Sequence, residues 1–268
     1  MNRINTTFAA LAEKNEKALV GFVTAGDPDI DRSRAITSAM CRNGVDILEL
    51  GVPFSDPTAD GPVIQRSSQR ALEHNTTLAT VLEMTADLRK TSQVPVILFS
   101  YYNPIYAYGI ARFYDDARAA GADGVLVVDL PPEESGELTG GWNGDDFALI
   151  RLIAPTTPAD RIATIANDAT GFLYVVSMTG VTGSSGLDTS HLGDFCARIR
   201  KTSTLPLCVG FGISTPEDVA AVAKTADGVV IGSAFERLIE EHIDNPDIVN
   251  VLARQTAVYK AATRPADG

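Results

Sequence analysis

The fold is decided around the stretch Leu48-Glu49-Leu50-Gly51-Val52-Pro53-Phe54-Ser55-Asp56-Pro57-Thr58-Ala59-Asp60-Gly61. An apolar run over residues 45–50 opens it and is closed by Gly51, which is typical of a buried strand. Glu49 falls at the carboxyl end of this strand, where burying a carboxylate is costly unless the group has a task. Loops on a rigid scaffold commonly carry function, so the loop that ends at Asp60 is a candidate site.

Seven further apolar runs of similar length predict strands, and most of them are followed by a segment of helical periodicity. Parallel pairing through right-handed crossovers accommodates this alternation. At 268 residues we expect a (β/α)₈ TIM barrel that forms a single domain over residues 1–268, with an extra N-terminal helix. An open doubly wound sheet is the alternative, although no Gly-x-Gly-x-x-Gly motif follows the first strand. The further strands are expected at residues 18–24, 94–100, 124–128, 149–153, 172–177, 206–209 and 229–231.

The predicted helices cover residues 3–15, 31–43, 109–120 and the segment from Pro158 to Asp168, with the last helices opening at Ser233. A long helical region over 62–91 is expected to break near residues 75–77. Residues 136–146 fit poorly, because glycines each cost roughly 1 kcal/mol inside a helix, so a truncated helix or an irregular loop is expected there. Arg151 is unusual within a strand, since it would need a buried acidic partner.

The composition excludes several classes of protein. A net charge of −12 and a pI of about 4.6 argue against nucleic acids and anionic membranes as partners. The chain has neither an apolar signal core nor a run long enough to span a bilayer. Three widely spaced cysteines and three scattered histidines argue against a disulfide framework and a zinc site. We therefore expect a soluble, cytoplasmic protein without a metal.

The first chemical feature is the carboxylate pair Glu49 and Asp60. All strands of a barrel end at the same mouth, so Glu49 should project into it, and the following loop can fold Asp60 back over it. Two carboxyl groups in different environments can take different protonation states, one exchanging a proton and one remaining charged. The alternative is structural: Asp60 caps the helix that begins near Pro62, and Glu49 is a buried acid satisfied by hydrogen bonds.

The second feature is a set of glycines after the last two strands, where barrels frequently bind phosphate. Gly210-Phe211-Gly212 and Gly232-Ser233 offer bare backbone N–H groups and the start of a helix, which together can hold an anion in an acidic protein. A third feature is the segment 177–186, whose glycines and hydroxyls suit a flap that closes over the site. Either set of glycines could instead serve only as tight turns or a flexible loop.

Several of these motifs together resemble the tryptophan synthase alpha chain family. The resemblance rests on the segment from Glu49 to Pro62, and it extends from about Phe22 past Ser233, over nearly the whole chain. It is also carried by Asp129-Leu130-Pro131-Pro132-Glu133-Glu134, Gly180-Val181-Thr182-Gly183 and Gly210-Phe211-Gly212-Ile213-Ser214.

The resemblance implies a lyase of tryptophan biosynthesis that cleaves indole-3-glycerol phosphate by a retro-aldol reaction, with no cofactor in this chain. It implies that Glu49 is the general acid and base, that Asp60 binds the indole N–H, and that Thr182 orients Asp60. The positions that match the family's indole pocket are Phe22, Phe99, Tyr101, Val128, Ile153, Tyr174, Thr182 and Phe211. The positions that match its phosphate site are Gly183, Gly212, Gly232 and Ser233.

The family also implies a partner, a tryptophan synthase beta chain that carries pyridoxal phosphate and receives indole within an alpha2-beta2 heterotetramer. Pro53, Phe54 and Asp56 match the loop that faces it. Three alternatives remain open from the sequence. These are a stand-alone lyase that releases free indole, another phosphate-binding barrel enzyme, and a phosphate-sensing subunit without activity, which would not need both carboxylates.

Overall fold

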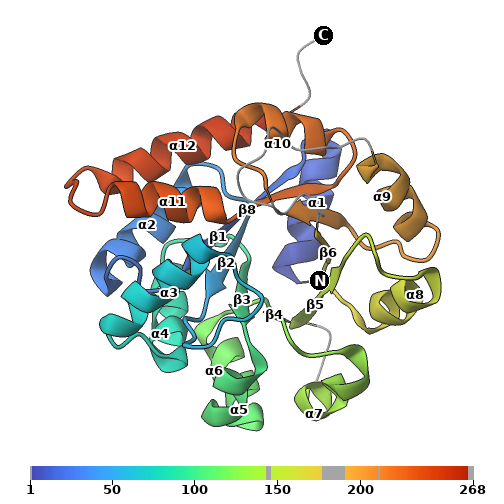
Figure 1. The fold of residues 1–268 in the computed structure, drawn as a ribbon, viewed down its shortest axis with the longest axis horizontal. Helices are drawn as coiled ribbons and strands as arrows, with labels where there is room; N and C mark the ends of the chain where they lie inside the picture. The colour runs from blue at the N-terminus through green and yellow to red at the C-terminus, as the bar shows by residue number, and fades with distance from the viewer. Residues whose placement is uncertain (1, 143–145, 177–190, 211, 265–268) are drawn as a thin grey trace.

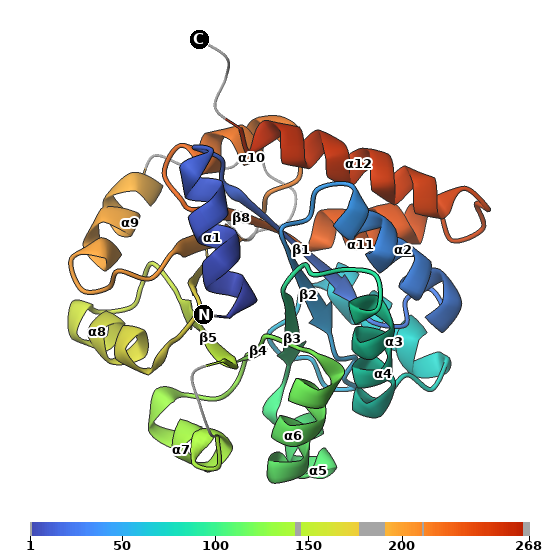
Figure 2. The same ribbon diagram turned by 180° about the vertical axis from the view of Figure 1, so that it is seen from behind.

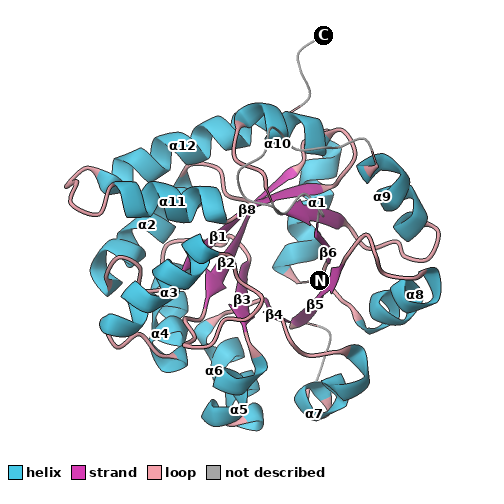
Figure 3. Ribbon diagram, viewed as in Figure 1, coloured by secondary structure: helices cyan, strands magenta, loops and turns pink. Residues whose placement is uncertain are grey.

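Eight parallel strands close into a barrel in the computed structural model, which describes residues 2–142, 146–176, 191–210 and 212–264. Each strand pairs with its sequence neighbours, and β1 pairs with β8 to complete the ring. The prediction of a (β/α)₈ barrel is therefore confirmed, and the open sheet is wrong because no strand is left as an edge. Figure 3 shows the strands enclosed by a ring of helices. The strands are β1 (Ala18–Thr24), β2 (Ile47–Gly51), β3 (Val96–Ser100), β4 (Gly124–Val127), β5 (Ala148–Ile153), β6 (Leu173–Val176), β7 (Leu207–Gly210) and β8 (Gly228–Ile231).

The helices follow the strands around the outside of the barrel (Figure 1). The predicted break in the region 62–91 is present, because Asn75 takes a positive φ of 57° and Thr77 starts a new helix with a capping box. The described helices are α1 (Arg3–Glu13), α2 (Ile30–Arg42), α3 (Pro62–Glu73), α4 (Leu78–Arg89), α5 (Tyr102–Tyr108), α6 (Ile110–Ala120), α7 (Ser135–Thr139), α8 (Ala159–Asp168), α9 (Leu192–Arg200), α10 (Pro216–Ala223), α11 (Ser233–Glu241) and α12 (Ile248–Ala262), with a short 3₁₀ turn η1 (Pro132–Glu134).

The extra helix α1 closes the end of the barrel at which the strands begin. Figure 2 shows it lying across this end. Ile4, Phe8 and Leu11 pack into the interior, and the Phe8 ring meets that of Phe172, just before β6, at 6.0 Å between centroids. Any site inside the barrel must therefore open at the other end, where the strands finish. The strand residues that fill this interior are Ala18, Val20, Ile47, Ile97, Leu126, Ala148, Ile150, Tyr174, Cys208 and Val230.

The alternate strand residues point outward and form the larger core with the helices. Leu48 and Leu50 on β2 belong to this outer cluster, whereas Ile47 belongs to the interior. Both faces of the strands are therefore apolar, as parallel strands covered on both sides require. The alternation also sets the direction of every polar residue on a strand, because side chains two residues apart share a face.

Among its described residues, the glycine-rich segment after β4 forms η1 and the five-residue α7, which confirms the prediction of a truncated helix. An aromatic cluster takes over part of the missing helix's role in covering the barrel. Trp142 stacks on Tyr114 of α6 at 5.4 Å and meets Phe147 edge-on at 5.2 Å. These contacts bury large aromatic surfaces and so compensate for the short helix.

Arg151 has the acidic partner that a buried guanidinium needs. Its Nε donates to Asp168 Oδ2 at 2.8 Å, and its Nη1 donates to the carbonyl oxygen of Leu130 at 2.6 Å. Asp168 ends α8, and it also accepts a hydrogen bond from Ser135 at the start of α7. Arg151 therefore ties β5, the loop after β4 and the helices on either side of this strand into one network.

Helix α5 is an element that the sequence pattern did not predict. Its first N–H, that of Tyr102, donates to Asp129 Oδ1 at 2.7 Å, so the carboxylate after β4 caps the helix after β3. Asp129 therefore contributes to the N-terminus of a helix in the neighbouring crossover rather than to its own turn. The helix depends on this contact from a neighbouring crossover, which local sequence does not reveal.

Candidate active site

Glu49 lies in the barrel interior near the carboxyl end of β2. Its side chain points inward because it shares a face with the interior residue Ile47, and it stands in register with Phe22 of β1 and Ile97 of β3. The residue is 0% exposed, and both of its carboxyl oxygens are buried without a hydrogen-bond partner among the described residues. The alternative that Glu49 is a satisfied structural acid is therefore not supported.

Burial raises the pKa of Glu49 from 4.5 to about 8. The carboxyl group is consequently protonated at neutral pH, because transfer of its charged form into the interior is unfavourable. A Glu49 anion would also raise the pKa of Tyr174 on β6 and of Cys208 on β7, both of which burial already raises. The carboxyl group thus faces across the interior toward β6 and β7. A buried, neutral acid in this place can donate a proton to a bound molecule.

Aromatic side chains form the interior layer around Glu49. Phe22 and Phe99 meet edge-on with 5.1 Å between ring centroids. The position two residues beyond Glu49 must be a glycine, since a Cβ on Gly51 would lie 2.7 Å from the Phe22 ring. A Cβ on Gly210 would likewise lie 2.3 Å from the Tyr174 hydroxyl. The absence of a side chain at these glycines on β2 and β7 therefore leaves the space that the Phe22 and Tyr174 rings occupy.

The predicted pocket residues separate according to the face of their strand. Phe99 and Val128 pack with the interior cluster and are half-buried, so they are accessible from the mouth. Ile153 packs with the outer cluster, whereas its neighbour Leu152 packs with the interior cluster and is half-buried. Leu152 was not singled out from the sequence, but the strand alternation from Ile150 would have indicated it. Thr182 and Phe211 lie outside the described residues.

Asp60 lies in the loop between β2 and α3 and is half-buried. Burial raises the pKa of its carboxyl group, while a hydrogen bond from the Tyr101 hydroxyl lowers it. The Tyr101 oxygen also accepts a hydrogen bond from the N–H of Ala59 at 3.0 Å. Asp60 does not cap α3, whose N-cap is Gly61 without a side-chain hydrogen bond. The loop is therefore held by Tyr101, a role that the sequence did not reveal for this residue.

The residues expected to face a partner precede Asp60 in the same loop. Pro53 is buried, Phe54 is half-buried, and Asp56 is exposed and accepts a hydrogen bond from Ser55 at 2.6 Å. The Phe54 ring packs on the ring of Tyr101 with 5.2 Å between centroids. One tyrosine therefore contacts both the outer part of this loop and its final carboxylate.

The predicted anion site has the backbone geometry that such a site needs. Gly232 is the N-cap of α11 and makes no side-chain cap, so the N–H groups of the first turn, beginning with Ser233, point toward the mouth. Gly212 lies in the loop after β7 with a φ of 74°, which favours glycine, and it is exposed. Gly183, the fourth predicted phosphate residue, lies outside the described residues.

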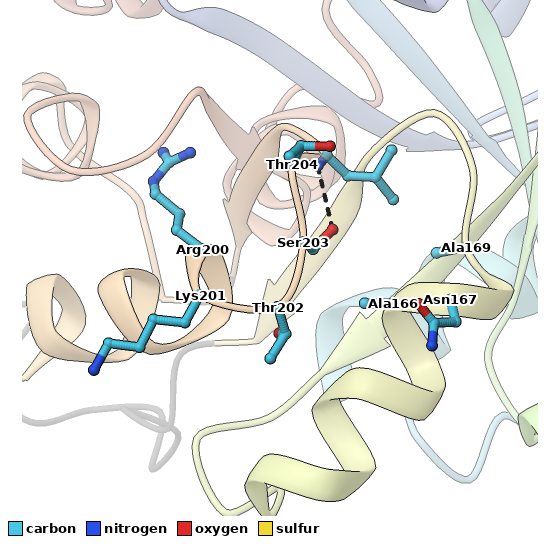
Figure 4. Close-up of a pocket in the computed structure, with 9 residues that line it drawn as sticks. Ala166, Asn167, Ala169, Arg200, Lys201, Thr202, Ser203 and Thr204 are labelled. Atoms are coloured by element: carbon cyan, nitrogen blue, oxygen red, sulfur yellow. Dashed lines mark hydrogen bonds between the residues drawn. The ribbon is translucent and has the colours of Figure 1, made fainter.

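A groove of about 450 Å³ lies at the opposite end of the barrel, between the ends of α8 and α9. Figure 4 shows Arg200 and Lys201 extending away from Asn167 on the facing helix. Arg200 is paired with Asp227 at 2.8 Å, and Ser203 Oγ accepts the N–H of Leu205 at 3.2 Å. The side chains do not converge, so this groove is not the candidate site.

Within the part of the chain that the structure describes, no group of three or more His, Cys, Asp or Glu side chains could hold a metal ion. None of the described helices is both long and apolar enough to cross a membrane.

The chain is similar to proteins of one family over nearly its whole length. The sequence profile of the family described as "Tryptophan synthase alpha chain" matches residues 8–264. A protein named tryptophan synthase alpha chain from Desulfosudis oleivorans is 71% identical, with 98% of this chain and 100% of that protein covered. One of the same name from Desulfatibacillum aliphaticivorans is 62% identical over the same shares.

Solved structures show the same likeness. The tryptophan synthase subunit alpha of Legionella pneumophila superposes with a TM-score of 0.91 at 40% identity, over 98% of each chain. A chain in a structure of tryptophan synthase from M. tuberculosis superposes with a TM-score of 0.88 at 28% identity, over 99% of this chain and 100% of that one.

Proposed function

The chain belongs to the tryptophan synthase alpha chain family and is a lyase that cleaves indole-3-glycerol phosphate in tryptophan biosynthesis, and from this premise we propose that Glu49 and Asp60 are its catalytic carboxylates. The observation that carries the proposal is the Glu49 carboxyl group, which is fully buried and has no described hydrogen-bond partner near the end of a barrel strand, where burial raises its pKa to about 8. The reaction must place a proton on C3 of the indole ring before the carbon–carbon bond can break. A neutral acid in an apolar layer is suited to that step.

Glu49 acts first as an acid and then as a base. It donates its proton to C3 of the indole ring, and the resulting carboxylate takes the proton of the neighbouring glycerol hydroxyl. The O–H electron pair becomes the new C=O bond of glyceraldehyde 3-phosphate, while the electrons of the broken carbon–carbon bond return to the ring and release indole. Glu49 ends the cycle protonated, as it began.

Asp60 stabilises the positive charge that develops on the ring while C3 is protonated. Its carboxylate accepts a hydrogen bond from the indole N–H, and this interaction strengthens as the nitrogen becomes positive. The hydrogen bond with Tyr101 supports this role, because it lowers the pKa of Asp60 against the effect of burial. Thr182 is proposed to orient the same carboxylate when substrate is bound.

The substrate lies between the aromatic layer and the anion site. Phe22, Phe99, Val128 and Tyr174 hold the indole ring, and their placement in the interior layer supports this part of the proposal. Tyr101 and Phe211 remain predicted pocket residues, whereas on β5 the interior-facing Leu152 takes the place predicted for Ile153. Backbone groups of Gly183, Gly212, Gly232 and Ser233 hold the phosphate, and the uncapped first turn of α11 is the feature that supports it.

The loop before Asp60 is the proposed contact with a tryptophan synthase beta chain. Phe54 packs on Tyr101, and the Tyr101 hydroxyl donates a hydrogen bond to Asp60. A partner that moves this loop can therefore move the Asp60 carboxylate. The beta chain carries pyridoxal phosphate and takes up indole within a cytoplasmic alpha2-beta2 heterotetramer, while this chain needs no cofactor of its own. Transfer inside the complex suits an apolar product that would otherwise escape.

Indole release from indole-3-glycerol phosphate tests the catalytic assignment. Glu49→Gln should lower kcat by at least about 10²–10⁴-fold, since it removes the transferable proton, and Asp60→Asn should also be strongly impaired. Both variants should still bind a non-cleavable indole alkyl phosphate. In the wild type kcat/KM should fall as pH rises above about 8, where Glu49 loses its proton. The control is Glu83→Gln, an exposed acid on α4. Turnover like that of the wild type in either catalytic variant would contradict the mechanism.

The same assay, run with and without a candidate beta chain, tests the partner. Strong activation on mixing supports the complex, whereas high activity of the chain alone supports a stand-alone lyase. No activity in either mixture would favour a phosphate-sensing subunit.

A further inference from the structure

Beside the proposed phosphate turn lies a charged cluster that the reaction does not use. It joins the loop after β1 to helices α3 and α11. Arg70 Nε and Nη2 donate to the two carboxyl oxygens of Asp27 at 2.7 and 2.8 Å. Arg66 makes the same two-pronged contact with Glu240 at 2.7 and 2.8 Å, and Arg70 Nη1 adds a bond to Glu240 at 3.0 Å. The positive charges of Arg66 and Arg70 are therefore paired with the carboxylates of Glu240 and Asp27.

Glu236 is a third acid in this cluster, and no arginine contacts it within the described chain. It is 0% exposed, and its Oε1 accepts the backbone N–H of Thr24 at 2.6 Å. Its Oε2 is buried and accepts no hydrogen bond from an N–H or hydroxyl donor among the described residues. The Asp27 carboxylate lies close enough to share a hydrogen bond with the Glu236 carboxyl group, which requires a proton on one of the two, and to repel a second negative charge. Because an unpaired buried anion is strongly destabilising, one of the three acids must be neutral, and Glu236 is the one without a cation.

The pKa of Glu236 agrees with this count of charges. Burial is the largest cause of a pKa well above its ordinary value, and the charge of Asp27 and a hydrogen bond with its carboxylate raise the pKa further. The Thr24 N–H and the more distant Arg70 act in the opposite direction but do not outweigh these causes.

The position of Glu236 connects it to the phosphate site. It lies in the first turn of α11, where its N–H donates to the carbonyl oxygen of Gly232 at 3.0 Å. The strand that it contacts, β1, also carries Phe22, and a Cβ on Gly232 would lie 3.2 Å from that ring. The bond from Thr24 therefore attaches the first turn of α11 directly to the strand that lines the site.

We propose that Glu236 is a positioning residue that works in its protonated form, holding the phosphate-binding turn of α11 against β1 without placing a negative charge beside the phosphate. This inference rests on the proposed role of Gly232 and Ser233 in phosphate binding. A charged Glu236 would oppose both the Asp27 carboxylate and a bound phosphate ester, so loss of its proton should weaken substrate binding rather than the chemical step.

The groups that face Glu236 determine what its ionisation does. The loop after β1 presents Asp27, and α3 presents Arg70 with Arg66 behind it. Glu240 lies one turn further along α11 and is already paired. From α12, Tyr259 packs on Phe235 at 5.4 Å between ring centroids and directs its hydroxyl to Ser214, away from the cluster. Ionisation of Glu236 therefore adds an anion that no neighbouring cation is free to pair with.

Substitutions of Glu236 separate its neutral form from its charge. Glu236→Gln keeps an oxygen that can accept the Thr24 N–H but never becomes charged, so KM for indole-3-glycerol phosphate should stay near the wild-type value at pH 7. In the wild type KM should rise at alkaline pH, and in this variant the rise should be absent. Glu236→Leu loses the acceptor, so KM should increase about tenfold while kcat changes little. Glu241→Gln, an exposed acid on the same helix, is the matched control.

Infrared spectroscopy provides an independent readout that does not depend on activity. The wild-type protein at pH 7 should show a carboxylic-acid C=O band that disappears in Glu236→Gln, and a separate band should disappear in Glu49→Gln. If Glu236→Leu does not fold, the infrared band and the KM profile of Glu236→Gln still decide the question.

The inference is overturned if the Glu236 band is absent, if Glu236→Gln raises KM at pH 7, or if it keeps an alkaline rise in KM like that of the wild type. Failure of the underlying phosphate assignment is distinguishable from these results. In that case an indole alcohol that lacks the phosphate would compete with indole-3-glycerol phosphate as strongly as the matching indole alkyl phosphate does, whatever the protonation state of Glu236.

Discussion

Replacement of Glu49 by glutamine should make the folded protein more stable at neutral and alkaline pH while removing its activity. The wild-type side chain is fully buried, and burial raises its pKa from 4.5 to about 8. At about 1.4 kcal/mol for each pH unit, this shift corresponds to about 5 kcal/mol of lost stability once the group is ionised in both states. At pH 7 the loss is about 3 kcal/mol, because the folded state still holds most of its proton.

The sign of this pH dependence of stability follows from how many protons the folded and unfolded states bind. The folded-state pKa of Glu49 lies above the unfolded-state value, so the favourable contribution of the neutral acid is fully present below pH 4.5 and is lost as the pH rises toward about 8. Glutamine stays neutral in both states. The difference in the free energy of unfolding between Glu49→Gln and the wild type should therefore grow from about pH 4.5 and level off above about pH 8.

Urea denaturation at closely spaced pH values between about 4.5 and 9 measures this difference, with equal m-values as the check that both proteins unfold alike. Other groups, including Glu236, titrate equally in both proteins and cancel. Glu83→Gln, which removes an exposed acid, should show almost no pH-dependent difference. A difference for Glu49→Gln that stays constant across this range would refute the claim that the carboxyl group is held neutral by burial.

Two further substitutions test the surroundings of the site. Tyr101→Phe removes the hydroxyl that lowers the pKa of Asp60, so activity should fall, most strongly at acidic pH, where Asp60 then takes up a proton. The control Tyr106→Phe, on a residue that is 60% exposed, should leave the pH profile of indole release unchanged. Gly51→Ala places a Cβ 2.7 Å from the phenylalanine ring on β1 and should lower the free energy of unfolding by about 1–3 kcal/mol. The control Gly136→Ala, which has open space at its Cβ, should not lower it. An unchanged denaturation midpoint for Gly51→Ala would contradict the packing argument.

The strands and their order could be predicted from local patterns. The run at residues 18–24 is apolar up to Thr24 and is followed by a Gly-Asp-Pro turn, and β1 has the same bounds. The short α7 was also predictable, because closely spaced glycines disfavour a helix wherever they occur. In contrast, α5 depends on a cap from Asp129 in the next crossover, so no local pattern predicted this helix.

The partners of the unusual charged residues could not be predicted. Arg151 finds Asp168 at the end of the following helix, and Asp60 finds Tyr101 on the next strand's loop. Glu236 falls on the apolar face of α11, at helical spacing from Gly232 and Ile239, which could have marked it as a buried acid. Even so, only closure of the barrel brings Thr24 and Asp27 to it.

The sequence by itself determined that a carboxylate stands at the end of a buried strand, that a second follows in a loop, and that glycines open the last helices of a parallel barrel. These are properties of short segments, because strand alternation and turn chemistry act over a few residues. Only the tertiary structure decided which acids are protonated. The pKa of Glu49 is raised because strands far apart in the chain together exclude water from its side chain, and exclusion of water is a property of the closed barrel rather than of any segment.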